Sequence, residues 1–481
     1  MPQKARIMKN NKNNKFKIGF ISLGCPKNLI DTEIMLKILA DDGYEITTED
    51  IEADIIIVNT CAFVESAKKE AIENILDVAW LKKNGGKKLK GIIVCGCLAE
   101  RYREEVLAEL PEVDALVGVF SIHDILEAVR HIEKKLSGKY ISLKPGEGFE
   151  LGGDRILTTP EYFAYIKIAE GCDNCCSYCV IPKIRSSFKA RKTEDIIKEA
   201  KELASLGVVE LAIVAQDTTR YENLPELLTG LCKIEGIKWI RLLYCYPDKI
   251  TDELIETIKN NDKIVKYIDM PIQHINDDIL AAMNRTGGSA AIRSAILRLR
   301  AHIPNITIRT TVITGFPGET REMFSELCDF LQEARFERLG AFAYSAEEGT
   351  PAAGFAKQLP QKEKERRQRA VMALQGKISR VQNQEKIGKT IKVLCEGFDK
   401  VSGVYYGRSE ADAPEIDGKV YFAPFEKVQS PGGVAATPFE KVQSPGGVAA
   451  TPFEKGAIGE GEFVEVKITK VIDYDLYGEA Q

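Results

Sequence analysis

The sequence predicts an α/β protein with three parts: an N-terminal parallel α/β domain, a central partial (β/α)6 barrel and a small C-terminal β-barrel. Strand-like and helix-like segments alternate over residues 17–136 and again over 155–385, whereas 386–481 has short strands and many Gly residues. A chain of 481 residues is also too long for one ordinary core, since domains typically hold about 100 to 200 residues.

The first domain shows the pattern of a parallel sheet covered by helices. Residues 17–22 form a short apolar run, and 31–40 have helical spacing with Gly43 as a stop. The segments 54–58 and 91–94 are continuously apolar, as expected of strands that are buried on both faces. A linker rich in Gly and charge, 137–154, follows.

The central domain contains six predicted strands with amphipathic helical stretches between them. Six strand–helix units favour an open or partial barrel. The predicted strands are 164–168, 209–214, 239–243, 266–269, 306–313 and 339–343.

The C-terminal segment contains an internal repeat. Residues 424–437 recur identically as 438–451, and a partial third copy ends at 455. The repeat has too few apolar residues and too much Pro and Gly to stack as a solenoid. We interpret 424–455 as a tandem insertion in a surface loop without a catalytic role.

Composition and charge exclude several classes of protein. Apolar residues make up 44% and charged residues 28%, which argues against wholesale disorder, and no apolar run is long enough to span a bilayer. The net charge of −5 argues against general attraction to nucleic acid. The basic tail 1–17 lacks the pattern of a secretory signal, so the 12 Cys are expected as thiols in the reducing cytoplasm.

Three cysteines follow the first central strand in the spacing C-x3-C-x2-C: Cys172, Cys176 and Cys179. This spacing lets one loop hold three thiolates around an iron–sulfur cubane and leaves one iron without a protein ligand. A small molecule with an amine and a carboxylate can chelate that iron. A zinc knuckle is the alternative, but zinc sites usually pair C-x2-C units to complete four ligands. We interpret Cys175 as a neighbour of the ligands, although it also stands in a C-x2-C register with Cys172.

Three further cysteines each follow a predicted strand of the first domain: Cys25, Cys61 and Cys97. Taken singly, each is more often a small buried apolar residue. Their common place beyond the carboxyl ends of parallel strands favours ligation of a second cluster. Cys97 is preferred over Cys95 because it lies further into its loop. The isolated cysteines are interpreted as structural: Cys232, Cys245, Cys328 and Cys395.

At these motifs the chain resembles the radical S-adenosylmethionine methylthiotransferases over nearly its whole length. The motifs at 22–28, 59–62, 96–98 and 170–172 are similar to the signatures of that family, and those at 214–219, 271–274 and 473–478 to its RimO branch. The resemblance implies an N-terminal three-Cys domain, a radical S-adenosylmethionine barrel and a C-terminal TRAM β-barrel, in this order.

The resemblance also implies a function. The RimO branch adds a methylthio group to the β-carbon of an aspartate on the twelfth small-subunit ribosomal protein. The implied cofactors are two [4Fe-4S] clusters and S-adenosylmethionine, and the implied partners are that protein and an electron donor such as flavodoxin or ferredoxin, with no membrane. The cluster of Cys172, Cys176 and Cys179 would bind S-adenosylmethionine, and that of Cys25, Cys61 and Cys97 would supply sulfur.

Two other functions compete with this one. The related branch modifies tRNA adenosine, but it typically has Gly-Gln-Asn where this chain has Ala215-Gln216-Asp217. Residues 386–481 also hold 11 basic against 15 acidic residues, which disfavours contact with phosphates and favours a protein substrate. The third possibility is a non-catalytic iron–sulfur electron-transfer protein or scaffold.

Three residues near the first cysteine loop are candidate cofactor contacts. Tyr178 lies between two predicted ligands and could pack on adenine, although a core aromatic is equally consistent with its type. Gln216 and Asp217 end the second strand and could bond to the methionine or ribose groups. A surface turn is the alternative for this pair.

Three candidates come from the fifth strand and the turn after it. Gly315 permits close backbone approach to a ligand and resembles the adenine-contacting turn of the family. Glu319 belongs to the same turn, where it would equally suit the first turn of a helix. Arg309 could bind a carboxylate through two hydrogen bonds, with a surface ion pair as the alternative.

Two residues depart from the family pattern. Cys175 stands where a basic or small residue is common, and Ser186 stands where Gly usually follows the arginine, here Arg185. Neither departure removes a predicted ligand, but both could change the shape of the loop. The insertion 424–455 lies inside the expected TRAM barrel, so the sequence does not predict which surface of that barrel binds the substrate.

Overall fold

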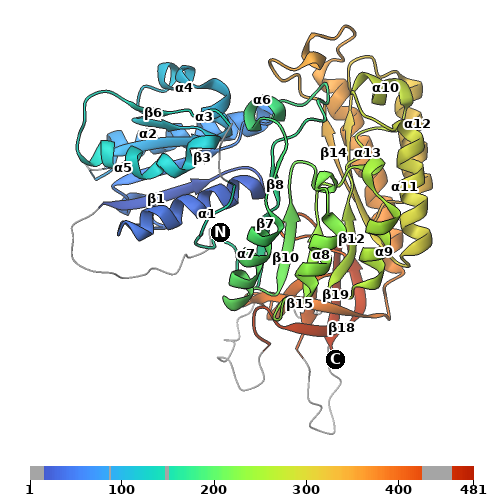
Figure 1. Cartoon of the computed structure of the whole chain (residues 1–481). Coiled ribbons are helices and arrows are strands. Elements are labelled where there is room, and N and C mark those ends of the chain that lie inside the picture. Colours follow the sequence, from blue (N-terminus) through green and yellow to red (C-terminus); the bar gives the residue numbers. More distant parts are fainter. Residues whose placement is uncertain (1–15, 86–87, 147–150, 425–457) are drawn as a thin grey trace.

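The computed structural model describes residues 16–85, 88–146, 151–424 and 458–481. Its described residues form three large sheets that match the three predicted parts, and one short two-stranded sheet in the central part (Figure 1). The predicted insertion 424–455 lies outside the described residues except for its first residue. No helix among the described residues is both long enough and apolar enough to cross a membrane.

The N-terminal domain is a parallel sheet of six strands in the order β2-β1-β3-β4-β5-β6. The strands are β1 (Lys17–Ser22), β2 (Glu45–Thr47), β3 (Ile55–Thr60), β4 (Gly91–Gly96), β5 (Ala115–Val117) and β6 (Tyr140–Ser142). The helices are α1 (Pro26–Asp41), α2 (Glu65–Asn84), α3 (Cys97–Tyr102), α4 (Glu104–Glu109) and α5 (Ile125–Glu133), with 3-10 turns η1 (Asp50–Glu52) and η2 (Val119–Asp124). Every residue of β3 and β4 is buried, as their apolar runs predict.

The sheet of this domain continues past the expected boundary at residue 136. Strand β6 falls in the stretch expected as a linker and pairs with β5 at the edge of the sheet. Its three residues carry too short an apolar pattern to be distinguished from a loop by sequence.

The central domain confirms the prediction of a partial barrel. Its six parallel strands have the order β14-β13-β12-β11-β10-β7, and the described residues form no pairing that closes the ring. The strands are β7 (Phe163–Lys167), β10 (Glu210–Val214), β11 (Trp239–Leu242), β12 (Ile264–Asp269), β13 (Thr307–Thr314) and β14 (Arg338–Ala343).

Helices cover the outer face of this half-barrel (Figure 1). They are α7 (Thr193–Ser205), α8 (Leu224–Cys232), α9 (Asp252–Asn260), α10 (Asp277–Ala282), α11 (Gly288–His302), α12 (Arg321–Ala334) and α13 (Gln361–Gln384). Short 3-10 turns lie between them: η3 (Thr218–Arg220), η4 (Pro247–Lys249) and η5 (Pro351–Gly354). A two-stranded ribbon, β8 (Ala169–Glu170) with β9 (Lys189–Ala190), encloses the loop of Cys172 and the short helix α6 (Ile181–Arg185).

The C-terminal segment forms the predicted closed barrel, with strands in the order β15-β16-β17-β19-β18. They are β15 (Thr390–Asp399), β16 (Val404–Ser409), β17 (Val420–Ala423), β18 (Phe463–Ile472) and β19 (Asp475–Ala480).

This barrel lies against the amino ends of the central strands (Figure 1). Arg408 pairs with Glu210, the first residue of β10, at 2.6 Å. Phe463 packs edge-on against Trp239, the first residue of β11, with ring centroids 4.8 Å apart. The carboxyl ends of the strands are therefore left for the cysteine loops, as in other open α/β sheets.

Candidate active site

The loop of Cys172, Cys176 and Cys179 lies beyond the carboxyl end of β8. Cys176 is buried and the other two thiols are partly exposed. Burial raises the pKa of Cys172, and burial together with the neighbouring thiolates of Cys176 and Cys172 raises that of Cys179 to about 12. The three thiols are therefore neighbours. Binding of iron would offset the repulsion between their thiolates.

Gln216 and Asp217 contact the loop that carries these thiols. Asp217 is fully buried and accepts hydrogen bonds from Asn174 Nδ2 at 2.8 Å and from Lys249 Nζ at 2.6 Å. Gln216 Nε2 donates to Glu170, but Gln216 Oε1 is buried without a hydrogen-bond partner among the described residues. A free buried acceptor fits the ammonium group of a bound S-adenosylmethionine, since buried polar atoms normally have partners.

Tyr178 lies in an apolar cluster with Phe316, Met283 and Tyr344. The guanidinium group of Arg285, which stacks on Tyr246 at 3.9 Å, also contacts Tyr178. Tyr246 Oη in turn lies 3.1 Å from Cys176 Sγ. The structure thus places Tyr178 beside the cysteine loop, in a setting that equally suits a core aromatic.

Gly315 and Glu319 form one closed turn after β13. The Gly315 N–H donates to Glu319 Oε2 at 2.5 Å, and Arg367 Nη1 donates to the same oxygen at 2.7 Å. Glu319 Oε1 lies 3.1 Å from His274 Nε2. Because both carboxylate oxygens have hydrogen-bond partners within the protein, Glu319 stabilises the turn and does not face an open site.

Arg309 is also committed to partners within the chain. Its Nη1 donates to Asp269 Oδ1 at 3.1 Å, and its Nε lies 3.4 Å from Asp417 Oδ1 of the C-terminal barrel. The guanidinium group therefore joins two domains through ion pairs. An ion pair was the alternative that the sequence allowed to contact with a ligand carboxylate, although these pairs are largely buried rather than at the surface.

Cys25, Cys61 and Cys97 lie at the carboxyl ends of the adjacent strands β1, β3 and β4. Burial, together with the charges of Cys97 and Cys25, raises the pKa of Cys61 to about 12, so the thiols are neighbours. A side chain at Gly24 would place its Cβ 2.7 Å from Cys61 Cβ, so glycine there allows the two loops to approach. Cys95 instead points into the sheet, with its Sγ 3.6 Å from Val58 O.

Neither cysteine set is arranged as a mononuclear metal site. Among the described residues, no three His, Cys, Asp or Glu side chains meet as closely as a single metal ion requires. In an iron–sulfur cubane each thiolate binds a different iron atom, so the sulfur atoms stay farther apart. Two sets of three thiols, with no histidine among them, fit clusters better than zinc.

A buried charge network joins the two cysteine sets. Lys167 Nζ donates to Asp31 Oδ1 at 2.6 Å and to Glu170 Oε2 at 2.7 Å. Arg185 donates to Glu170 at 2.8 Å, and its Nη2 lies 3.7 Å from Cys97 Sγ. These residues were missed by sequence reasoning, although a lysine inside the apolar run of β7 was an available signal.

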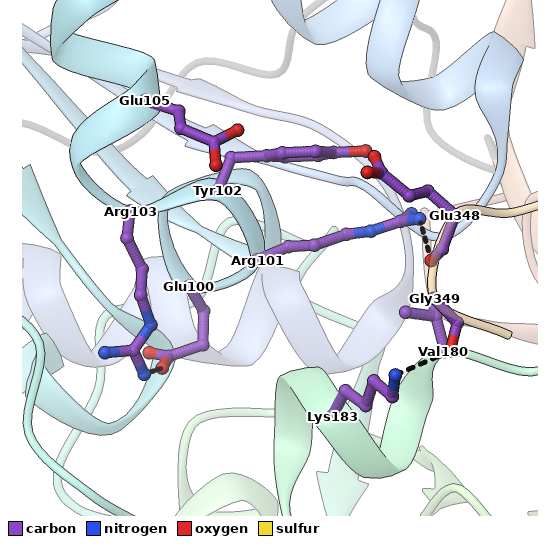
Figure 2. Close-up of a pocket in the computed structure, with 9 residues that line it drawn as sticks. All are labelled: Glu100, Arg101, Tyr102, Arg103, Glu105, Val180, Lys183, Glu348 and Gly349. Carbon is purple, nitrogen blue, oxygen red and sulfur yellow. Dashed lines mark hydrogen bonds and ion pairs between the residues drawn. The ribbon is translucent and has the colours of Figure 1, made fainter.

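A surface pocket lies at the seam between the first two domains (Figure 2). Arg101 Nη2 donates to Glu348 O at 3.0 Å across one side, and Lys183 Nζ donates to Gly349 O at 2.5 Å across the other. No cysteine lines this pocket, so it is separate from both cysteine sets.

Comparison with known families divides the chain into the same three parts. Residues 17–118 match the uncharacterized protein family UPF0004, 166–331 match the radical SAM superfamily, and 387–480 match the TRAM domain. Radical S-adenosylmethionine methyltransferase TsrM from Kitasatospora setae, solved with cobalamin and a [4Fe-4S] cluster, is similar in fold with a TM-score of 0.51. The two chains are 13% identical, and the match covers 70% of this chain and 77% of the other.

Curated relatives match over nearly the whole chain. The ribosomal protein uS12 methylthiotransferase RimO of Thermoanaerobacter sp. (strain X514) is 47% identical over 96% of this chain and 99% of its own length. The protein of the same description from Pelotomaculum thermopropionicum is 51% identical over 84% of this chain and 93% of its own length. The chain belongs to the RimO family of radical S-adenosylmethionine methylthiotransferases.

Proposed function

We propose that this enzyme adds a methylthio group to the β-carbon of an aspartate in ribosomal protein uS12. One observation supports the proposal above all. Two cysteine sets lie at the carboxyl ends of two sheets, and the buried cations Lys167 and Arg185 connect them through Asp31 and Glu170. Two such sites facing one region suit a reaction that needs both a radical and a sulfur donor. The curated relatives named for action on uS12 support the choice of substrate.

Each cysteine set would hold one [4Fe-4S] cluster. Cys172, Cys176 and Cys179 would bind the cluster that S-adenosylmethionine chelates, and Cys25, Cys61 and Cys97 would bind the second. When bound, these groups supply the electron transfer and the sulfur. An electron donor of the flavodoxin or ferredoxin class would reduce them in the cytoplasm.

The chain itself positions these groups. Lys249 holds the Asp217 carboxylate in place at 2.6 Å, and the free Gln216 Oε1 is available to the methionine ammonium. The Gly315 turn is closed by Glu319 and packs against Lys364 of α13, so it holds the end of β13 in place beside Tyr178. The C-terminal barrel closes the amino end of the strands, so the substrate must approach from the carboxyl end.

The proposed substrate is tested with the full chain after anaerobic reconstitution. Purified uS12 and tRNA are incubated separately with enzyme, S-adenosylmethionine and a reductant, and the products are measured by mass spectrometry. A methylthio group on an aspartate of uS12 supports the proposal. Modification of tRNA alone contradicts it, and absence of 5′-deoxyadenosine would indicate a non-catalytic iron–sulfur protein.

The ligand assignment is tested by counting iron. Cys61→Ala should lose about half of the iron and still release 5′-deoxyadenosine, because the other cluster remains. Cys176→Ala should lose a similar share together with 5′-deoxyadenosine. Cys232→Ala, which changes a partly exposed cysteine on α8, is the matched control and should keep both clusters. Full iron content in Cys61→Ala would show that the N-terminal ligands are misassigned.

A further inference from the structure

Lys27 reaches from the N-terminal domain into the mouth of the central half-barrel. It lies near the start of α1, two residues after Cys25, and is 7% exposed. Its Nζ lies 3.5 Å from the centroid of the Tyr244 ring and donates to Ala215 O at 3.4 Å. Both contacts belong to residues just beyond the carboxyl ends of β10 and β11.

The ammonium group of Lys27 has no carboxylate partner. Among the described parts of the chain, no carboxylate oxygen lies within 4.0 Å of Lys27 Nζ. The neighbouring buried cations differ in this respect, since Lys167 and Arg185 share Asp31 and Glu170, and Arg309 holds Asp269. The Cys25 thiol is the first group of opposite charge that acts on Lys27, with Glu170 and Asp269 farther away, and none of them forms an ion pair with it. Buried ammonium groups are costly unless they are paired, so a direct carboxylate partner can still come from outside the chain.

The position of Lys27 relates it to both cysteine sets. Cys25 is two residues away on the same segment, and Ala215 directly precedes Gln216 and Asp217, which contact the loop of Cys172. A group that binds to Lys27 therefore lies between the two places where the clusters would be held.

We propose that Lys27 binds the side-chain carboxylate of the substrate aspartate, an inference that rests on the proposed function. The carboxyl carbon of aspartate is bonded directly to its β-carbon. A carboxylate held by Lys27 would thus bring the reacting carbon to the barrel mouth, and the Tyr244 ring below the ammonium would keep the lysine in place. Lys27 would act as a positioning and specificity residue, because a neutral asparagine or a nucleobase cannot form the ion pair.

The test compares two peptides in binding to the reconstituted full chain with S-adenosylmethionine. One peptide carries the uS12 target aspartate, and the other has asparagine in its place. Wild type should prefer aspartate by roughly ten- to hundredfold in Kd, the usual range for a buried hydrogen bond to a charged group. Lys27→Met should abolish this preference, and Lys27→Arg should keep most of it.

Lys37→Met is the matched control, because Lys37 lies on the same helix α1 and its exposed ammonium pairs with Asp41 at 2.6 Å. It should keep the wild-type preference. If Lys27→Met fails to take up iron, the charge-reversed pair tests the same contact: Lys27→Glu should bind a peptide with lysine at the target position more tightly than one with aspartate.

The outcomes separate this inference from the proposed function. Wild-type enzyme that modifies the uS12 aspartate but binds both peptides equally would overturn the role of Lys27 alone. A Lys27→Met variant with unchanged preference and a shifted reduction potential of the N-terminal cluster would also overturn it, because Lys27 would then act on the cluster. Wild type that binds neither peptide and modifies neither would contradict the proposed function itself.

Discussion

Arg185 of the central domain donates a hydrogen bond from Nη2 to Asn28 Oδ1 of the N-terminal domain at 2.6 Å. The same guanidinium group pairs with Asp31 and Glu170 and lies 3.7 Å from Cys97 Sγ. Its side chain is 1% exposed. One buried cation thus links the loops of both cysteine sets, and the relative position of the two domains depends on it.

Replacement of Arg185 should strongly destabilise the contact between the domains. Arg185→Met leaves two buried carboxylates with Lys167 as their only cation, and breaking such a network typically costs about 3–5 kcal/mol. Arg185→Lys should be intermediate, because an ammonium group cannot reproduce the guanidinium fork. Denaturant unfolding of the cluster-free chain measures the loss.

The control for Arg185 is Arg369→Met. Arg369 is exposed and pairs with the exposed carboxylate of Glu365, four residues earlier on α13. Its loss should change the free energy of unfolding by less than about 1 kcal/mol. Equal stability of the two methionine variants would show that the buried network does not hold the domains together.

The fold was largely predictable because its signals are local. The continuous apolar runs that became β3 and β4 identify buried parallel strands, and the alternation of six such runs with helices identifies the half-barrel. The prediction was wrong at β6, which was expected as part of a linker, because three residues at a sheet edge are too few to show the alternation of a strand. Short edge strands depend on tertiary pairing, which a sequence pattern does not contain.

The site was predictable only where chemistry and spacing coincide. The cysteines could be found because thiols beyond strand ends are unusual and converge by topology. For Arg309 and Glu319 the sequence left open whether each contacts a ligand or only the protein, and the structure gives each of them protein partners far away in sequence. Lys27 and Arg185 were missed for the same reason, since a single residue type does not reveal its three-dimensional partner.

Ser186 offers a gain of stability. Its backbone has φ 61° and ψ −168°, a region that is essentially restricted to glycine and costs other residues about 1–3 kcal/mol. Its carbonyl accepts a hydrogen bond from the Cys172 N–H at 3.1 Å, so the conformation supports the cysteine loop. Ser186→Gly should raise the free energy of unfolding by about 1 kcal/mol, as measured by denaturant unfolding.

Ser187→Gly is the matched control for this change. Ser187 is exposed and has no positive φ, so glycine there should only increase the entropy of the unfolded chain and destabilise slightly. A Ser186→Gly variant that is no more stable than wild type would show that the loop tolerates serine without strain.

Lys386 should make stability depend on pH in the alkaline range. Burial lowers its pKa to about 8, and nearby Arg338 contributes in the same direction. A lysine in the unfolded chain has a pKa of about 10.4. At a pH between the folded and unfolded pKa values, the unfolded chain binds more protons than the folded chain, so stability rises with pH. Lys386→Met should therefore stabilise the protein at pH 7, and its advantage over wild type should shrink as the pH rises from about 8 to about 10.

Unfolding in denaturant at both pH values measures this effect. A constant advantage of Lys386→Met across the pH range would mean that the lysine is solvated as an ordinary ammonium in the folded state.

Glu347 should hold the outer edge of the seam between the domains. Its buried carboxylate accepts a hydrogen bond from Arg101 Nη1 of α3 at 2.8 Å and lies 3.3 Å from Lys68 Nζ of α2. Glu347→Gln would leave both cations without this charge, which should cost about 1–3 kcal/mol in local opening. Hydrogen exchange of the amides in α3 should become faster by a matching factor, whereas iron content should not change because no cysteine contacts this carboxylate.

Glu348→Gln is the sharpest control, since Arg101 contacts Glu348 only through its backbone carbonyl (Figure 2). If both glutamine variants exchange at the same rate, the seam is held by backbone contacts and the charge of Glu347 contributes nothing to it.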